Sequence, residues 1–451
     1  MGREEAQNVA RDMGLVSDPE RTVAYVRAVG QRLVEQVQQR DFTFEFHVVD
    51  MEEPNAFALP GGYVYVSRGL LALVNSEDEL ANVLGHEIGH VLARHAGQRM
   101  SAAAPLAILS GIATAATGMV SPALGGVVSG IGQLTGGLLL ASYSRDQERE
   151  ADRMAMELSA RGGWNPAGMS ELLRTLERDE DARPEPQRQL SFFASHPRTA
   201  ERVAATAALA SSYSRTTASP LAADRAAVLS RLDGLLVGKD PAQGFFEKDR
   251  FIQPAMGFSL RFPADWRKQN ARAFVAAAPP DGTAVAALSL AGAGGDPMPL
   301  ARKAAVDMGG DPARSVRAMS LNGLPTARLE GAVRTERGPV YLHLTWIAYR
   351  AQVYEVTGMS GTSRADAYRP TFEAVAASFQ PLSATERAGV TETRLRTRQA
   401  RAGEGIAAFV ARTGSTWSPA ETAIANALES GATLAGGQAV KVSLAQPFTA
   451  P

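Results

Sequence analysis

The feature that most constrains this chain is the run His86-Glu87-Ile88-Gly89-His90, which lies inside a segment that predicts a helix. Ser76 begins a capping box, S-E-D-E, which is typical of a helix N-terminus, and we expect the helix to continue to about Arg99. At about 100° per residue, four residues carry the chain about 40° beyond one full turn, so the two imidazoles face the same way. Glu87 borders that face and can reach a water bound to a metal there. The run therefore predicts a metal site on a helix.

Composition limits the other ligands that such a site can use. The chain has no cysteine, which excludes disulfides, thiolate nucleophiles, Cys-ligated zinc and iron–sulfur clusters. Histidine and carboxylate side chains are left as ligands. The chain has 46 basic and 47 acidic residues and a net charge of −1, which argues against a nucleic-acid binder that works through a basic surface.

A catalytic zinc site needs a third protein ligand and an open position for water. His95 lies about half a turn round the predicted helix from His86, so we expect it to face away as a structural or surface residue. Glu148 and Asp152 stand at i, i+4 on a second predicted helix, 145–161. One of these carboxylates can bind zinc while the other accepts the ring N–H of a ligating histidine. The alternative for this helix is an ordinary solvated charged face.

No charged residue occurs between Arg99 and Arg145. This segment, 100–144, is rich in Gly and Ala and has Pro122 near its middle. One interpretation is a hairpin of membrane-spanning helices. The other is an apolar hairpin that packs on the domain or lies at a membrane surface. Gly, Ala, Ser and Thr outnumber Leu and Ile, so membrane insertion would be weakly driven, which favours the second interpretation.

The pattern changes after the first predicted domain, residues 1–237. Alternating and β-branched runs separated by Gly, Pro and Asp predict a separate α+β domain over 250–383, with helices at 300–309 and 364–378. Its GFSLRFPADW and AVAASFQPL runs loosely resemble PsbP-like domains. His343 lies in one of its predicted strands among apolar residues, so we expect it in the core or at an interface.

Four motifs together resemble one protein family. They are HEIGH, then SRxxExxAD (144–152) after the apolar insert, together with NAFALPGGYVYVSRGLL (55–71) and SHPRTAERV (195–203). In this order they resemble the zinc metallopeptidase family that includes HtpX, BepA, LoiP and the CAAX prenyl proteases, and its periplasmic members in particular. The resemblance implies a mainly helical gluzincin (zincin) fold with one Zn²⁺ per chain. The residues that it implies are the zinc ligands His86, His90 and Glu148, the general base Glu87, and Asp152 hydrogen-bonded behind a ligand.

Three further positions are site candidates. The resemblance places His196 on a loop near the metal, where it can occupy the open zinc position and inhibit the enzyme; it can instead hydrogen-bond the oxyanion, or cap the next helix. Arg202 is a candidate for a structural or oxyanion-side role. The residues proposed as an edge strand that pairs with an extended substrate are Asn55, Ala56, Phe57 and Ala58.

Residues 392–446 resemble a LysM module, a small βααβ fold that binds glycans containing N-acetylglucosamine. Their order is strand, helix, helix and strand, ending in L-x-G-G-Q-x-V-K-V. GEGI (403–406) departs from the G-D/E-T/S-L that is usual in that family, which puts glycan binding in doubt. The alternative is a small domain that packs on its neighbour.

These observations predict a zinc-dependent metalloendopeptidase of the bacterial cell envelope that hydrolyses misfolded or envelope proteins. The alternative is a latent protease that serves as a peptidoglycan-binding or chaperone-like assembly factor. The expected partners are protein or peptide substrates, peptidoglycan through 392–446 and a membrane surface through 100–144, with no nucleic acid. The N-terminal residues lack an apolar signal segment, so we interpret the chain as a mature form of the periplasm or cell envelope whose signal sequence has been removed.

Overall fold

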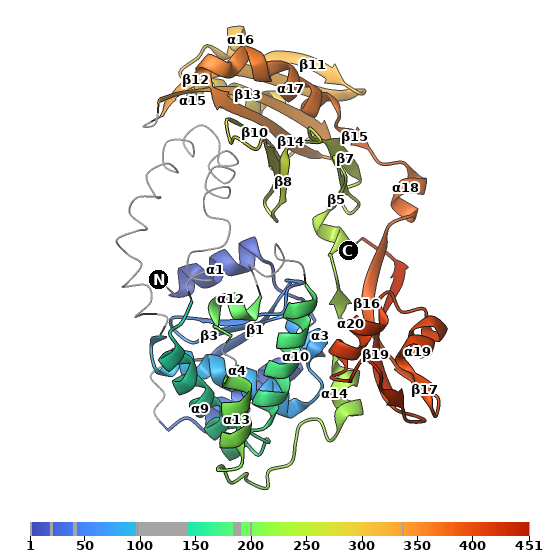
Figure 1. The fold of residues 1–451 in the computed structure, drawn as a ribbon. Coiled ribbons are helices and arrows are strands. Elements are labelled where there is room, and N and C mark those ends of the chain that lie inside the picture. The colour runs from blue at the N-terminus through green and yellow to red at the C-terminus, as the bar shows by residue number, and fades with distance from the viewer. Residues whose placement is uncertain are drawn as a thin grey trace. The chain divides into compact units, whose positions relative to one another are not determined.

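The computed structural model describes residues 2–18, 21–38, 43–95, 97, 142–183, 191–198, 201–335 and 338–450. These residues form two compact units, and each is described by itself (Figure 1). The first comprises the described residues before Asp240 together with Thr391–Gln446, and the second comprises Asp240–Val390 and the described residues from Pro447 on. The first unit is largely helical and the second is built on β-sheets, so the predicted α+β, multidomain class is confirmed. The domain boundaries 1–237, 250–383 and 392–446 stay predictions.

The elements of the first unit include those of the predicted metal site. They are α1 (Gly2–Asp12), α2 (Thr22–Glu35), β1 (Glu45–Val49), β2 (Ala56–Leu59), β3 (Tyr63–Ser67), α3 (Arg68–Leu73), α4 (Glu77–Leu92), α9 (Arg145–Gly162), α10 (Gly168–Ala182), α12 (Phe192–Ser195), α13 (Arg202–Ala210), α14 (Arg225–Leu232), β4 (Leu236–Val237), β16 (Thr391–Gln399), β17 (Glu404–Gly405), α19 (Ile406–Thr413), α20 (Pro419–Ala425), β18 (Thr433–Leu434) and β19 (Ala439–Pro447). The predicted apolar insert, 100–144, lies outside the described residues except for its last three. Within the described ranges, no helix is long and apolar enough to cross a membrane.

Helix α4 carries the H-E-x-x-H run through the interior of the first unit. Ser76 caps it as predicted, because its Oγ accepts a hydrogen bond from the backbone N of Glu79 at 3.1 Å. The helix ends at Leu92 and not near Arg99, because Arg94 takes a φ of +58° and the chain leaves the helical path. Helices α2, α9 and α10 pack against α4, so its histidines lie inside the protein (Figure 1).

Small residues let α4 and α9 approach each other closely. A Cβ atom at Gly85 would lie 3.1 Å from the Cα of Ala155, and one at Gly89 would lie 3.2 Å from the Cα of Ala151. On each helix the two positions are four residues apart, so they form one stripe facing the partner. The close approach brings the first turns of α9 within reach of the histidine face of α4.

A three-stranded sheet of order β1-β3-β2 lies beside these helices. Strand β1 is parallel to β3, and β2 is antiparallel to it. Strand β2 begins within the candidate substrate segment and lies at an edge of this sheet. Helix α2 starts at Thr22, whose backbone N donates a hydrogen bond to the carboxylate of Asp18 at 3.2 Å.

Glu77, at the first position of α4, joins several segments of the first unit. Its buried carboxylate accepts hydrogen bonds from the Tyr25 hydroxyl (3.0 Å) and from Trp164 Nε1 (2.7 Å). It also accepts from the backbone N atoms of Leu221 (2.7 Å) and Ala222 (2.5 Å). One carboxylate therefore ties the start of α4 to α2, to the turn after α9 and to the segment before α14. Its negative charge is also favourable at a helix N-terminus.

The C-terminal segment packs on the rest of the first unit through buried polar contacts. Lys441 is fully buried, and its Nζ donates to the carbonyl oxygens of Ala72 (2.8 Å) and Val74 (2.9 Å) at the end of α3. Arg225 donates to the side chains of Asn75 and Asn426. The ammonium group of Lys441 thus satisfies carbonyls that a helix C-terminus otherwise leaves without partners.

The second unit is built around a seven-stranded sheet of order β11-β12-β13-β14-β10-β9-β8 and a four-stranded sheet of order β15-β7-β6-β5. Its elements are η2 (Pro241–Gln243), β5 (Phe245–Glu247), β6 (Arg250–Gln253), β7 (Phe258–Arg261), β8 (Arg267–Asn270), β9 (Phe274–Ala278), β10 (Ala284–Ala293), α15 (Met298–Asp307), α16 (Pro312–Ser315), β11 (Arg317–Leu321), β12 (Leu324–Thr335), β13 (Gly338–Tyr349), β14 (Gln352–Gly361), η3 (Thr362–Arg364), α17 (Ala365–Ala377), β15 (Gln380–Pro381) and α18 (Ala384–Ala388). Helices α15 and α17 match the two predicted helices, and they belong to separate apolar cores on opposite faces of the larger sheet. His343 is buried in β13, as expected.

We expect Glu77→Ala to lower the free energy of unfolding by about 3 kcal/mol, because it leaves several buried N–H and O–H donors without an acceptor. Urea denaturation followed by circular dichroism measures the change. Glu157→Ala is the matched control, because it removes an exposed ion pair with Arg161 and should change stability by less than about 0.5 kcal/mol. Equal effects of the two substitutions would contradict the central position given to Glu77.

Candidate metal centre

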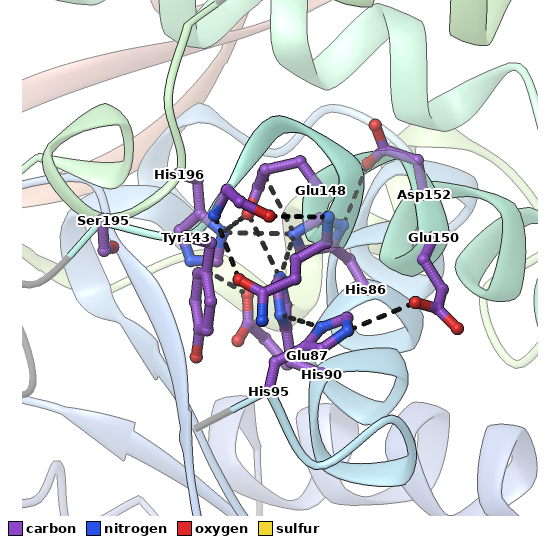
Figure 2. A network of polar contacts seen from close by, with 12 residues as sticks. His86, Glu87, His90, His95, Tyr143, Glu148, Glu150, Asp152, Ser195 and His196 are labelled. Atoms are coloured by element: carbon purple, nitrogen blue, oxygen red, sulfur yellow. Dashed lines mark hydrogen bonds and ion pairs between the residues drawn. The ribbon is translucent and has the colours of Figure 1, made fainter. Parts of the chain in front are cut away.

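Four side chains from α4, from α9 and from the end of α12 converge inside the first unit (Figure 2). Metal-ligating atoms of His86, His90, Glu148 and His196 all lie within 4.8 Å of one another, and none of these residues is more than 3% exposed. The Nε2 atom of His86 lies 3.0 Å from Nε2 of His90 and 3.2 Å from Nδ1 of His196. Oε1 of Glu148 lies 3.0 Å from Nδ1 of His196 and 3.3 Å from Nε2 of His90. The structure thus brings together the three predicted ligands and the predicted fourth position.

Local structure fixes the positions of Glu148 and His196, the two residues of the cluster that lie outside α4. Glu148 lies in the first turn of α9, where Ser144 and Gln147 form a complete capping box. His196 follows directly after α12, and its ring stacks on the ring of Phe192 with centroids 4.3 Å apart and planes 9° apart. The backbone N of Tyr143 donates to the carbonyl of Ser195 at 2.9 Å, which ties this segment to the entry of α9.

Asp152 and Arg202 lie behind the converging atoms. Oδ1 of Asp152 accepts the Nδ1–H of His86 at 2.9 Å, which leaves the lone pair on Nε2 of His86 directed into the cluster. The guanidinium of Arg202 binds both oxygens of Asp152 at 2.7 and 2.8 Å, and its Nη1 lies 2.5 Å from Oε2 of Glu148. Burial opposes the ionisation of Asp152, but Arg202 and the hydrogen bonds from His86 and Arg202 outweigh it and lower the pKa of Asp152 to about 2. This geometry favours the structural alternative for Arg202.

The expectation that His95 faces away from the site is wrong. Because α4 ends at Leu92 and the chain turns at Arg94, the helical wheel no longer applies at His95. Nδ1 of His95 lies 3.0 Å from Nδ1 of His90, and its Nε2 lies 3.3 Å from the carboxylate of Glu150. His95 therefore holds the second ring nitrogen of His90, as Asp152 holds that of His86.

Glu87 lies fully buried beside the cluster. Within the part of the chain that the structure describes, neither of its carboxylate oxygens has a hydrogen-bond partner, and Oε1 lies 3.6 Å from Nε2 of His196. Burial raises the pKa of Glu87, although the neighbouring His196 and His86 oppose the shift. A carboxylate that takes up a proton more readily than usual is suited to general base catalysis.

The donor set fits a zinc ion. Imidazole nitrogen and carboxylate oxygen are common zinc ligands, and four of them are the usual number. His86 and His90 each have their other ring nitrogen engaged by a partner, which is the arrangement that orients metal-bound histidines. Nε2 of His196 and both carboxylate oxygens of Glu87 are buried without a hydrogen bond from any described residue, which is costly unless an ion or water engages the cluster.

Sequence reasoning missed two aromatic residues of the site. The ring of Tyr143, which Figure 2 shows beside the cluster, stacks on His90 with centroids 3.8 Å apart. The ring of Phe192 stacks on His196. Their only sequence signal is position, because Tyr143 directly precedes the cap of α9 and Phe192 lies one helical turn before His196. Of the candidate edge segment, Ala56, Phe57 and Ala58 lie in β2, and the backbone N of Asn55 donates to Ser67 Oγ at 2.9 Å.

Comparison with known proteins connects this site to a family. Residues 20–210 match the family model of Peptidase family M48. The chain is 32% identical over 170 residues to the beta-barrel assembly-enhancing protease of Escherichia coli, which covers 36% of this chain and 34% of that protein. It is 33% identical over 185 residues to the mitochondrial metalloendopeptidase OMA1 of Schizosaccharomyces pombe (40% and 51%), and 32% identical over 162 residues to the metalloprotease LoiP of Escherichia coli (35% and 59%). The matched part of the chain thus spans between 34% and 59% of the length of these relatives.

We expect Gly89→Val to weaken zinc binding about tenfold or more, because the added atoms push α9 and its Glu148 away from the histidines of α4. Competition of the full chain with a chromophoric chelator measures the affinity. Ala204→Val is the control, because it places the same β-branched residue at an exposed helical position. Unchanged zinc affinity in a folded Gly89→Val chain would contradict the importance of this helix contact.

Proposed function

We propose that this chain is a zinc-dependent metalloendopeptidase of the bacterial cell envelope, acting on misfolded or envelope proteins. The match of residues 20–210 to the model of Peptidase family M48 supports the proposal. The observation that carries the proposal is the convergence of His86, His90 and Glu148 beside the unpaired carboxylate of Glu87. Relatives that are named as proteases support the activity, and a relative named for β-barrel assembly supports the envelope setting.

Each residue of the site would have its own role in peptide hydrolysis. When bound, zinc supplies a Lewis acid that polarises a carbonyl and lowers the pKa of water. Glu87 accepts the proton of the attacking water and returns it to the leaving amine. Asp152 keeps His86 in the tautomer that presents Nε2, and Arg202 balances the charge of the two neighbouring carboxylates.

His196 would regulate this site by occupying its fourth position. Its Nδ1 lies 3.2 Å from Nε2 of His86 and 3.0 Å from Oε1 of Glu148, where it competes with the water needed for hydrolysis. The residue is fully buried and stacked on Phe192, which supports a closed, self-inhibited state. Activity would then require the segment that carries His196 to move away.

The substrate would lie along the edge of the three-stranded sheet. Strand β2 lies at an edge in the order β1-β3-β2, and the proposal is that its residues Ala56, Phe57 and Ala58, with Asn55 before them, pair with an extended peptide. The sheet order supports this role. A membrane-surface contact through 100–144 is part of the same proposal for an envelope enzyme.

We further propose a LysM-like fold for residues 392–446, with peptidoglycan as its ligand. Helices α19 and α20 lie in sequence between β16 and β19, and these two strands are neighbours in a sheet of order β19-β16-β4. This βααβ order supports the fold. The alternative function, a latent, peptidoglycan-binding or chaperone-like assembly factor, places the same segment in the main role.

We expect Glu87→Gln to reduce cleavage of an unfolded casein probe by about 10² to 10⁴-fold, because glutamine cannot accept a proton. The zinc content should stay at the wild-type value, since Glu87 is not among the converging ligand atoms. The control is Glu157→Gln, an exposed substitution on α9. Both substitutions are tested in chains that keep His196 and in chains that carry His196→Ala. Sustained proteolysis by Glu87→Gln would overturn its role as general base.

We expect His196→Ala to raise the rate of casein cleavage about tenfold or more, because it opens the fourth position at the metal. The measurement is made on zinc-loaded protein, with His47→Ala as a control that removes a histidine outside the cluster. A zinc-loaded His196→Ala chain without turnover would contradict self-inhibition and favour the assembly-factor alternative.

A further inference from the structure

A second group of metal-ligating side chains lies in the second unit, and the proposed protease activity does not use it. The group consists of Glu330 on β12, His343 on β13 and Glu373 on α17. One ligand atom of each lies within 4.8 Å of the corresponding atoms of the other two. This cluster therefore has the composition and compactness of a small metal site.

The fold brings the three residues together by register and by one close helix contact. Glu330 and His343 are direct partners across the antiparallel pair β12–β13. On the other side of His343, its partner on β14 is Gly358. A Cβ atom at Gly358 would lie 2.2 Å from Cγ of Phe372, so glycine lets α17 pack close to the sheet there. Glu373, next to Phe372, is thereby held near His343.

The burial of His343 and its unpaired ring nitrogens point to a ligand. Its side chain is completely buried, and neither ring nitrogen has a hydrogen-bond partner among the residues that the structure describes. Its Nε2 lies 3.8 Å from Oε1 of Glu330, which is too long for a hydrogen bond. Two ligands that each bind one zinc ion at about 2.0–2.2 Å are about 3–4 Å apart, so this separation suits an ion between them.

The carboxylates are held by partners that leave oxygens for an ion. Oε2 of Glu330 accepts hydrogen bonds from the Tyr341 hydroxyl (2.8 Å) and from Nε of Arg369 (3.1 Å), while Oε1 faces His343. Oε1 of Glu373 accepts from Nη1 of Arg328 at 2.9 Å. The two arginines balance the two carboxylates, so an ion must compete with them and should bind more weakly than at the protease centre.

We propose that Glu330, His343 and Glu373 form a second metal site, which takes a divalent transition-metal ion of the zinc class. One imidazole and two carboxylates suit Zn²⁺ better than Mg²⁺ or Ca²⁺, which prefer oxygen ligands throughout. The side chains of Glu330 and Glu373 are 29% and 43% exposed, so an ion can reach the site from solvent and exchange there.

The test uses the full chain with His86→Ala and His90→Ala, which together remove the protease centre. Zn²⁺ is titrated against a chromophoric chelator, and we expect one equivalent to bind this background. Adding Glu373→Gln should weaken that binding about tenfold or more. Glu247→Gln is the matched control, because it makes the same substitution at an exposed position of β5 in the same unit and should leave the affinity unchanged.

Adding His343→Phe should abolish binding, and circular dichroism reports whether that chain folds. The partly exposed Glu373→Gln keeps the test decisive if His343→Phe does not fold. No Zn²⁺ bound by the His86→Ala, His90→Ala background would overturn the proposal, as would binding that Glu373→Gln leaves unchanged or that Glu247→Gln weakens equally. Because the background lacks the protease centre, these outcomes are independent of the proposed peptidase activity.

Discussion

The close contact between α4 and α9 is the constraint on which the site of the first unit depends. Gly85 and Gly89 on one helix face Ala151 and Ala155 on the other, and the distances leave almost no room for a larger side chain on α4. Because the stripe runs along both helices, it fixes their spacing and their register at once. Glu148 and Asp152 can reach the histidines of α4 only at that spacing. The H-E-x-x-H run is thus a helix-packing motif as well as a set of ligands.

A second consequence of this packing is that the site is both highly charged and almost fully buried. Buried charges are tolerated when they are paired and hydrogen-bonded. Arg202 balances Asp152 and Glu148 from behind, and His95 with Glu150 supports His90 from the other side. Both carboxylate oxygens of Glu87 and Nε2 of His196 are left without hydrogen bonds from described residues beside the cluster, which is where a metal would bind. The charges behind the site are thus balanced by ion pairs, and the groups inside it are left for a metal to bind.

The sequence predicted those features of the site that depend only on local patterns such as helical periodicity. The spacing of His86 and His90, and of Glu148 and Asp152, follows from helical periodicity, so the faces were predictable without a fold. Which of Glu148 and Asp152 binds the metal, and which accepts the ring N–H of a ligating histidine, depends on where α9 lies. The sequence alone leaves this open. His95 was misplaced because a turn at Arg94 ends the helix, which periodicity does not reveal. The stacking of Tyr143 and Phe192 and the anchoring of Lys441 on α3 join residues far apart in the chain, so they needed the tertiary structure.

We propose that His86, His90, Glu148 and His196 together enclose one zinc ion in a closed site. Anomalous diffraction at the zinc absorption edge, from crystals of the zinc-loaded chain, tests it most directly. We predict a strong peak within coordination distance of all four side chains, with no water completing the ligand set. A fully zinc-loaded chain with no peak at this position, or with a peak from which His196 is absent, would contradict the account.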